Sequence, residues 1–544
     1  MSVETILLLA LVSVAIIAVV HRVCDAVGLP AAAVLTLVGI GYALLPGPNV
    51  TLDPHIVLTF VLPPLLYSAA LDSSLIAIRR NLRTVVSLSV ALVLATALVI
   101  GVGMHLFVTG TTLAAGIALG AAVAPPDPVA ALAVGRRVGL PGRLIVLIQG
   151  EGLLNDATAL TTLTVAVSAA VGSGFSFGSA VGEFVLAAAG GLVVGAGIAF
   201  IHRLLRPFVS DPLTANAISL ALPFLCYLVG EKLHVSGVLA VVVAGLIIGH
   251  DAPRFASGAS RLQTSAVWRL IDYLLEGFVF LLIGQQLPEV VHGLRHYPSS
   301  TIAVAVVITV GVVLVLRPLW LMLTQLLPRS LHTRLGGSGE RGNRLSGREV
   351  VALSWSGTRG VISLAAIFTL PLTTHAGTPF PDRDLLLFCT FMVVLVTLVG
   401  QGLTFAPLAR ALGLRANEAD RVRLRNQARV ASVQAALAML TDLEHDDETP
   451  DEEKRAVKAA RDNLDTRLER YQGRLESLDE AEEGEVPVSQ RYESMLRVRR
   501  LVIEAQREEI LRWRDAGRLP DAGLRVLERE LDNEERMLPD RPAG

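Results

Sequence analysis

Charged residues and cysteines are scarce in this sequence. Of its 544 residues, 18% are Asp, Glu, Lys or Arg, whereas 52% are hydrophobic and the mean hydropathy is +0.57. A soluble globular protein of this length would carry more charge and fewer apolar runs. The three cysteines, Cys24, Cys226 and Cys389, have neither metal or redox spacing nor a disulfide pattern. This composition argues against a soluble enzyme or a disulfide-stabilised domain and predicts a membrane protein.

Motifs of common enzyme classes are also missing. The sequence contains no phosphate loop, no zinc-binding His-Glu pattern and no nucleophile motif. It therefore predicts no enzyme activity and no cofactor, and nothing in it predicts nucleic-acid binding. The first five residues lack the basic region of a secretory signal, so the first apolar run is predicted to be a retained span.

Thirteen apolar segments are predicted to cross the membrane, because a span needs about 20 mostly apolar residues. They lie near residues 5–21, 28–46, 56–71, 84–108, 112–134, 144–171, 180–201, 213–231, 235–249, 268–288, 299–326, 348–372 and 385–409.

Basic residues gather in alternate loops, as expected for loops on the cytoplasmic side. The even-numbered loops contain only Lys232, Arg295 and Arg383. The odd-numbered loops contain Arg22, Arg79, Arg80, Arg83, Arg136, Arg137, Arg143, Arg203, Arg206, Arg254, Arg261, Arg329, Arg334, Arg341 and Arg344. This alternation supports thirteen crossings, with the N-terminus outside and the C-terminus in the cytoplasm.

The composition changes beyond residue 412. Charges of both signs become dense, and Leu496, Ile503 and Ile510 recur on one helix face. We expect residues 1–412 to form a transmembrane domain and 413–544 a cytoplasmic helical tail. The segment 483–487 is predicted to separate two tail helices. The tail is either a solvated appendage with many ion pairs or a regulatory or dimerising domain.

Three prolines, Pro125, Pro126 and Pro128, surround Asp127 in the fifth predicted span. Each removes a helix donor and clashes with the preceding turn, so this helix is predicted to break. Broken backbone at membrane depth is tolerated where protein or water satisfies it, and it supplies carbonyls and helix ends for ion coordination. The alternative is a simple kink, with Asp127 near a cytoplasmic helix end.

A second polar group, at residues 149–158, lies in the sixth predicted span. Glu151 and Asn155 share a helix face, and Asp156 lies about 100° further round. Gly152, one turn before Asp156, is predicted to leave room beside its carboxylate. Asp156 can bind a cation or a proton, because burial favours the protonated carboxyl group and a nearby cation favours the ionised one. The alternative is a polar cluster that only holds helices together.

Two arginines, Arg317 and Arg359, lie in the eleventh and twelfth predicted spans. Arginine stays charged, so each needs a partner, and Glu151 is the expected partner of one. The alternative for Arg317 is snorkelling to the cytoplasmic surface. Gly357 and Gly360 flank Arg359 and predict a second weakened helix. Its position matches that of the fifth span in the other half, as in an inverted repeat.

One further acidic residue, Glu276, lies in the middle of the tenth predicted span. It is either a second ionisable site or a packing residue paired with a polar neighbour.

These residues together resemble the monovalent cation:proton antiporter family, in the branch of the NhaP and NHE sodium/proton exchangers. The bacterial members with a charged C-terminal tail are the most similar. The matching motifs run in family order over about residues 1–412. They are Leu62-Pro63-Pro64-Leu65-Leu66-Tyr67, Asp127-Pro128-Val129-Ala130, Gly150-Glu151-Gly152-Leu153-Leu154-Asn155-Asp156, Ser236 to Gly245, Phe280-Leu281-Leu282-Ile283-Gly284, Arg317 and Gly357-Thr358-Arg359-Gly360.

The resemblance implies an all-α polytopic homodimer with inverted repeats, in which unwound helices of spans five and twelve cross at mid-membrane. It implies that Asp156 carries Na⁺ or H⁺, that Asp127 helps to bind Na⁺, and that Asn155 lies beside them. It also implies an ion pair between Glu151 and Arg317. The crossing would be supported by Arg359, Pro126 and Pro128.

The resemblance therefore predicts an antiporter of the cell membrane that exchanges Na⁺ for H⁺ by alternating access, with K⁺ or Li⁺ as other cations. An Asn-Asp pair is similar to the electroneutral branch. The family often has Thr at the position of Pro126 and Ser at that of Gly152, so two hydroxyl groups are missing here and Na⁺ selectivity is in question. The alternatives from other classes are a cation channel and a membrane receptor.

Overall fold

The computed structural model describes residues 3–45, 53–172, 177–209, 211–326, 345–445, 450–480, 490–536 and 538. Within these ranges the regular structure is helical, apart from an isolated antiparallel bridge between Thr373 and Pro379. The chain divides into two compact units, Met1–Ala416 and Asn417–Gly544. The expected separator at 483–487 and the four arginines of the eleventh loop lie outside the described residues.

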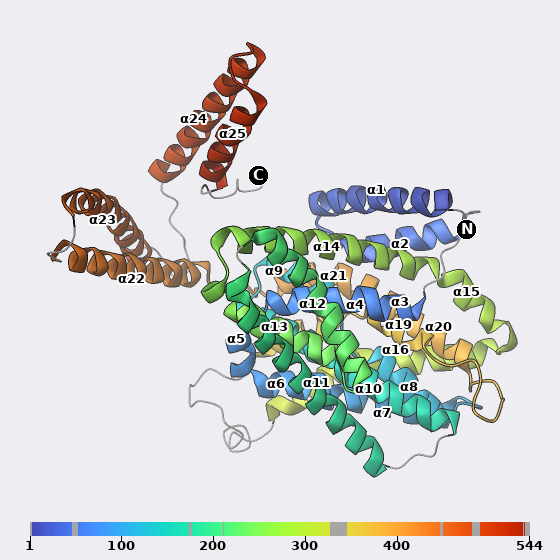
Figure 1. The fold of residues 1–544 in the computed structure, drawn as a ribbon. Coiled ribbons are helices and arrows are strands. Elements are labelled where there is room, and N and C mark those ends of the chain that lie inside the picture. The colour runs from blue at the N-terminus through green and yellow to red at the C-terminus, as the bar shows by residue number, and fades with distance from the viewer. Residues whose placement is uncertain are drawn as a thin grey trace. The chain divides into compact units, whose positions relative to one another are not determined.

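The first unit is a bundle of long apolar helices (Figure 1). Its helices are α1 (Val3–Val27), α2 (Ala31–Ala43), α3 (Pro54–Ile56), α4 (Leu62–Leu71), α5 (Leu75–Arg80), α6 (Leu82–Val86), α7 (Leu92–Phe107), α8 (Leu113–Val123), α9 (Pro128–Val138), α10 (Gly142–Val171), α11 (Phe177–Leu205), α12 (Pro212–Lys232), α13 (Gly237–Phe255), α14 (Gly258–Gln285), α15 (Leu287–His292), α16 (Ser299–Leu326), α18 (Gly347–Trp355), α19 (Val361–Phe368), α20 (Arg383–Leu395) and α21 (Gly402–Ala411).

Ten helices or joined helices in the described residues are long and apolar enough to span a membrane. The three other expected spans correspond to α2, which has 13 residues, to α14, and to the separated helices α18 and α19. The all-α polytopic membrane fold is thereby confirmed. The number of thirteen crossings stays a prediction.

The two predicted breaks are present. Between α8 and α9 the chain leaves the helix at residues 124–127, and α9 begins with Pro128 at a position where a missing N–H costs nothing. Asp127 caps α9, because its carboxylate accepts the N–H of Val129 at 2.9 Å. Between α18 and α19 the non-helical segment is 356–360.

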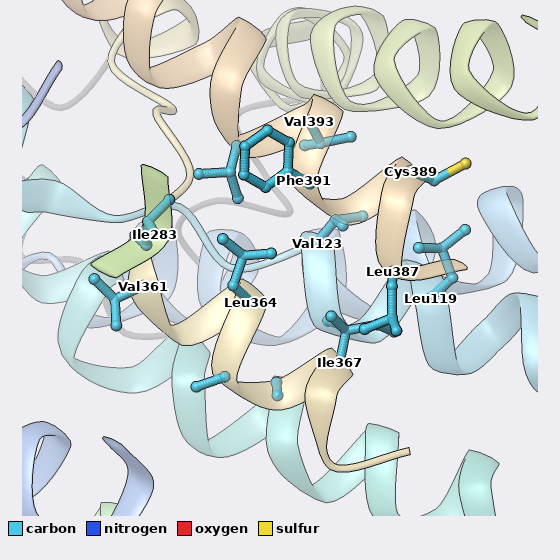
Figure 2. Close-up of a cluster of buried hydrophobic side chains, with 14 of the residues drawn as sticks. Leu119, Val123, Ile283, Val361, Leu364, Ile367, Leu387, Cys389, Phe391 and Val393 are labelled. Atoms are coloured by element: carbon cyan, nitrogen blue, oxygen red, sulfur yellow. The ribbon is translucent and has the colours of Figure 1, made fainter. Parts of the chain in front are cut away.

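Apolar packing fixes the second broken helix in the bundle. Figure 2 shows Val361, Leu364 and Ile367 of α19 among apolar side chains of α8, α14 and α20. Leu364 and Ile367 are fully buried. This packing holds the short α19, which at eight residues is too short to be a stable helix alone.

Among the described residues, three spans contain a π-helical turn, which the sequence does not predict. These turns are η1 (Val57–Val61), η2 (Ser87–Ala91) and η5 (Val396–Gln401). A π-turn inserts a residue into the helix and often occurs at functional sites. In this molecule η2 and η5 each supply a hydroxyl group to the site described below.

Glycines let several helices approach backbone to backbone. A side chain at Gly39 of α2 or at Gly284 of α14 would overlap the backbone of the other helix. Gly116 and Gly120 of α8 pack in the same way against α7. These glycines therefore serve packing inside the unit.

The described residues of the second unit form two helical hairpins. One consists of α22 (Glu418–His445) and α23 (Asp451–Glu480), with ion pairs Arg423–Asp479 and Arg461–Glu444 at 2.7 Å each. The other consists of α24 (Gln490–Asp515) and α25 (Asp521–Arg536), where Arg507 contacts Asp532 at 2.8 Å and Glu535 at 2.9 Å. Ile503, at the centre of the predicted heptad stripe, is buried in the second hairpin.

Candidate functional site

The two broken segments cross and are joined by backbone hydrogen bonds. The N–H of Asp127 donates to the carbonyl of Thr358 at 2.7 Å. The hydroxyl of Thr358 donates to the carbonyl of Asp127 at 2.9 Å. Gly360 packs so closely against the Asp127 carboxylate that any side chain there would overlap it. Each break thus satisfies polar backbone groups that the other exposes, as broken membrane helices require.

Helix α10 brings Asn155 and Asp156 to this crossing. The amide nitrogen of Asn155 donates to the carbonyl of Pro126 at 2.9 Å, which ties α10 to the first break. The amide oxygen of Asn155 is buried without a hydrogen-bond partner. Asp156 is 3% exposed, and its carboxylate makes no hydrogen bond or ion pair with the residues that the structure describes. Unpartnered oxygens of this kind are costly unless they bind a proton or a cation.

The third acidic residue of the region, Glu151, has a partner. Its carboxylate forms a bidentate ion pair with the guanidinium of Arg317, whose Nη2 lies 2.8 Å from Oε2. Both side chains are at most 3% exposed. The Nε of Arg317 donates to the carbonyl of Leu353 at 3.0 Å. The pair therefore joins α10 and α16 to α18, the first half of the second broken helix, and Arg317 does not snorkel.

The other buried arginine, Arg359, donates to backbone carbonyls. Its Nε lies 2.7 Å from the carbonyl of Val123, the last residue of α8, and its Nη1 lies 2.9 Å from the carbonyl of Gly357. The carbonyl end of a helix carries partial negative charge, which a cation stabilises. Arg359 thus sits in the second break and holds the end of the first broken helix.

Pro126 and Pro128 occupy different positions in the crossing. The carbonyl of Pro126 accepts from Asn155, whereas the ring of Pro128 packs against Gly152 of α10. A side chain at Gly152 would overlap that ring. The space that the sequence predicted beside Asp156 at this glycine is therefore filled by proline.

Two hydroxyl groups from π-turns complete the surroundings of the site. Thr397 of η5 accepts the N–H of Arg359 at 2.9 Å. Ser89 of η2 donates to the carbonyl of Glu151 at 3.2 Å. Sequence reasoning assigned no role to these residues or to Thr358. Only Thr358 carried a signal, because it lies inside the Gly-rich motif of the second break.

A cavity of about 310 Å³ lies between two groups of helices next to the crossing. Residues of α1, α2 and α14 line one side, and residues of α9 and α21 line the other. Glu276 of α14 lines this cavity, and within the described part of the chain its carboxylate has no hydrogen-bond or ion-pair partner. This position favours the ionisable alternative for Glu276. Arg137, at the cavity wall, donates to the carbonyls of Cys24 and Asp25.

Comparison with known proteins gives a consistent result. The family model described as "Sodium/hydrogen exchanger, transmembrane" matches residues 9–411. An uncharacterized Na⁺/H⁺ exchanger of Mycobacterium tuberculosis is 32% identical over 500 residues, which are 90% of this chain and 88% of that protein. The sodium, potassium, lithium and rubidium/H⁺ antiporter of Bacillus subtilis is 34% identical over 59% of this chain and 48% of its own length.

Solved structures share the fold. The sodium proton antiporter MjNhaP1 of Methanocaldococcus jannaschii aligns with a TM-score of 0.58 at 19% identity. The alignment covers 75% of this chain and 99% of that one.

Proposed function

The chain belongs to the sodium/hydrogen exchanger family and is a monovalent cation/proton antiporter, and on that premise we propose that it exchanges one Na⁺ for one H⁺ by alternating access. The transmembrane antiporter domain would be residues 1–412, and residues 413–544 would be a cytoplasmic tail.

The observation that carries the site assignment is the unpartnered, buried carboxylate of Asp156. Sodium ions prefer oxygen ligands, and a carboxylate in a low-dielectric site needs either a cation or a proton to neutralise it. The free amide oxygen of Asn155 and the carboxylate of Asp127 are the further oxygens that the site offers. Asp156 and Asp127 would bind Na⁺, with Asn155 beside them, and Asp156 would take the proton when Na⁺ leaves.

Competition at one carboxylate explains a one-for-one exchange. A single group that accepts either Na⁺ or H⁺ carries the same charge in both directions. Glu151 does not add a second exchangeable site in this scheme, because Arg317 neutralises it. The Asp127 carboxylate accepts the N–H of Val129, which holds it at the start of α9.

The preference for one alkali cation over another depends on the oxygen ligands that the site offers. Gly152 and Pro126 supply no hydroxyl, so carbonyl, amide and carboxylate oxygens would select the ion. These oxygens are hard ligands that bind Na⁺, Li⁺ and K⁺ alike, so the ligand types would discriminate little among the three cations. The Bacillus relatives are named for four alkali cations, which supports broad rather than strict selectivity.

The cavity beside Glu276 would give ions access from one side of the membrane. It separates α1, α2 and α14 from α9 and α21, so a movement of the two groups of helices against each other would close it. Alternating access in transporters with broken helices follows this pattern. With the orientation predicted from the basic loops this would be the cytoplasmic side, because the lining residue Arg137 belongs to a predicted cytoplasmic loop. We also propose a homodimer in the cell membrane.

The test uses everted membrane vesicles with an imposed pH gradient. Addition of Na⁺, K⁺ or Li⁺ to vesicles with the wild-type protein is expected to dissipate the gradient, with Na⁺ most effective. Asp156→Asn is expected to abolish this response, because an amide neither ionises nor binds a proton. Asp211→Asn is the matched control: Asp211 is an exposed N-cap of α12, and Asn caps helices equally well.

Two outcomes would contradict the proposal. Equal activity of wild type and Asp156→Asn would remove Asp156 from the transport site. A cation current without proton movement would favour the channel alternative.

A further inference from the structure

A second cavity of about 310 Å³ lies away from the crossing, between α4, α11, α12, α13 and α14. Five basic side chains line it, namely His202, Arg203, Arg206, Arg261 and Arg269, together with three acidic ones, Asp72, Asp251 and Asp272. Apolar residues such as Leu71, Ile248 and Trp268 form much of the remaining wall, together with the hydroxyl residues Ser68, Ser219, Ser260, Thr264 and Ser265. Four arginines therefore face three carboxylates in a wall that is otherwise made of apolar, hydroxyl and imidazole side chains.

The acidic residues leave much of this basic charge unmatched. Asp251 is the only acidic partner of Arg203 among the described residues, at 3.8 Å, which is too long for a hydrogen bond. Asp272 accepts the hydroxyl of Ser68 at 2.5 Å instead of an arginine. Arg206 donates to the carbonyl of Val209 at 2.6 Å and makes a longer contact of 3.4 Å with the hydroxyl of Ser260. Each guanidinium has five N–H groups, so most of them remain available to an anion.

An apolar groove continues from this cavity. Its volume is about 170 Å³, and its wall consists mainly of Ile198, Ile201, Leu205, Ile218, Leu222 and Leu225 from α11 and α12. The two spaces share His202, Arg206 and Ala215. A ligand that fills both would have a negatively charged end beside the arginines and a hydrocarbon end along α11 and α12.

Exposed apolar side chains surround the same arginines. Leu204, Leu205 and Phe208 are 54–84% exposed beside Arg203 and Arg206. Leu262 and Leu270, next to Arg261 and Arg269, are about as exposed. Alternation of exposed apolar and basic residues is expected where helices meet the boundary between acyl chains and headgroups.

We propose that the cavity and the groove together bind one anionic phospholipid. Its phosphate would lie among Arg203, Arg206 and Arg261, and an acyl chain would occupy the groove between α11 and α12. Basic pockets between helices on the cytoplasmic side bind lipid headgroups in this way, and arginine suits phosphate because it donates two parallel hydrogen bonds. A free phosphate ion would use the arginines but leave the groove empty, so we assign the site to a lipid.

The test measures how added lipid stabilises the purified full chain in detergent. Phosphatidylglycerol is expected to raise the unfolding temperature more than phosphatidylcholine. The double variant Arg203→Gln, Arg261→Gln is expected to weaken the apparent affinity for phosphatidylglycerol by about tenfold, because it removes two cationic partners of the headgroup. Both arginines are exposed, so the substitutions are compatible with folding.

The matched control is the double variant Arg79→Gln, Arg80→Gln. It removes the same charge from α5, where both side chains are exposed and neither lines the cavity. It is expected to retain the wild-type response. A second variant, Ile201→Trp, fills the groove from an exposed position and is expected to weaken lipid binding without a change of charge.

Three results would overturn the proposal. The first is that the double variant Arg203→Gln, Arg261→Gln responds to phosphatidylglycerol like the control variant. The second is that Ile201→Trp leaves the affinity for phosphatidylglycerol unchanged. The third is that soluble glycerol phosphate stabilises the wild type as strongly as the lipid does, which would mean that the arginines bind a free phosphate compound.

Discussion

Two carboxylates five residues apart on α10, Glu151 and Asp156, have opposite surroundings. Glu151 is neutralised by Arg317 within a bidentate pair, whereas Asp156 has no partner among the described residues. Both are buried, so burial alone does not distinguish a structural acid from an exchanging one. The presence or absence of a fixed cation does, because a permanently paired carboxylate cannot release its partner during each cycle.

This difference predicts opposite consequences of two similar substitutions. Glu151→Gln is expected to destabilise the protein by about 3–5 kcal/mol, because it leaves Arg317 charged and unpaired in the interior. Asp156→Asn breaks no hydrogen bond with a described residue and is expected to unfold near the wild-type temperature. Thermal unfolding of both variants in the same detergent measures the contrast. An equal loss of stability would show that Asp156 also has a structural role.

Gly152 permits a second residue-scale prediction. Because its Cα packs against the ring of Pro128, Gly152→Ser is expected to destabilise the crossing by about 1–3 kcal/mol through overpacking. A serine hydroxyl at this position is therefore not expected to supply a Na⁺ ligand. Unfolding temperature and Na⁺-dependent transport are the two readouts. A stable variant with higher Na⁺ preference would contradict this packing argument.

At the scale of the elements, the two broken helices depend on each other. Thr358 closes the crossing, since its hydroxyl and its carbonyl both bond to the backbone of Asp127. Thr358→Val keeps the side-chain shape but leaves the carbonyl of Asp127 without this donor, which costs about 1–3 kcal/mol when such a group is buried. We expect a lower unfolding temperature and slower transport. Thr161→Val, which removes only a bond within α10, is the control.

The kinetics of Thr358→Val show what the bond does. A lower transport rate with unchanged Na⁺ affinity would indicate that the crossing changes shape during the transport cycle. Unchanged stability and unchanged transport would mean that water replaces the hydroxyl and that the bond is dispensable.

The elements also show which parts of the architecture a sequence can predict. Three prolines around Asp127 forced the first break, and the glycines beside Arg359 indicated the second. The π-turns were not predictable, because Ser87–Ala91 and Val396–Gln401 have ordinary helical composition. A π-turn arises from tertiary contacts, such as those of Ser89 and Thr397 with the site.

Hydrogen-bond partners that are backbone groups cannot be identified from the sequence. The need of Arg359 for a partner followed from its charge, but its acceptors are the carbonyls of Val123 and Gly357, which any residue type would provide. Charge alone made Glu151 the expected partner of one of the two arginines, but only the family resemblance selected Arg317, since 166 residues separate the two side chains.

For the whole molecule, the loop charges make a prediction about orientation that the helical bundle alone does not. All three native cysteines are buried, so a single cysteine introduced at an exposed position would be the accessible thiol among the described residues. Arg80→Cys lies in a predicted cytoplasmic loop and Ala376→Cys in a predicted outer loop, and both positions are exposed. In intact cells a membrane-impermeant maleimide is expected to label Ala376→Cys and to leave Arg80→Cys unlabelled until the membrane is permeabilised. The opposite labelling pattern would show that the protein has the inverse orientation in the membrane. The cavity beside Glu276 and the cavity between α4, α11, α12, α13 and α14 would then face the outside, where anionic headgroups are scarcer.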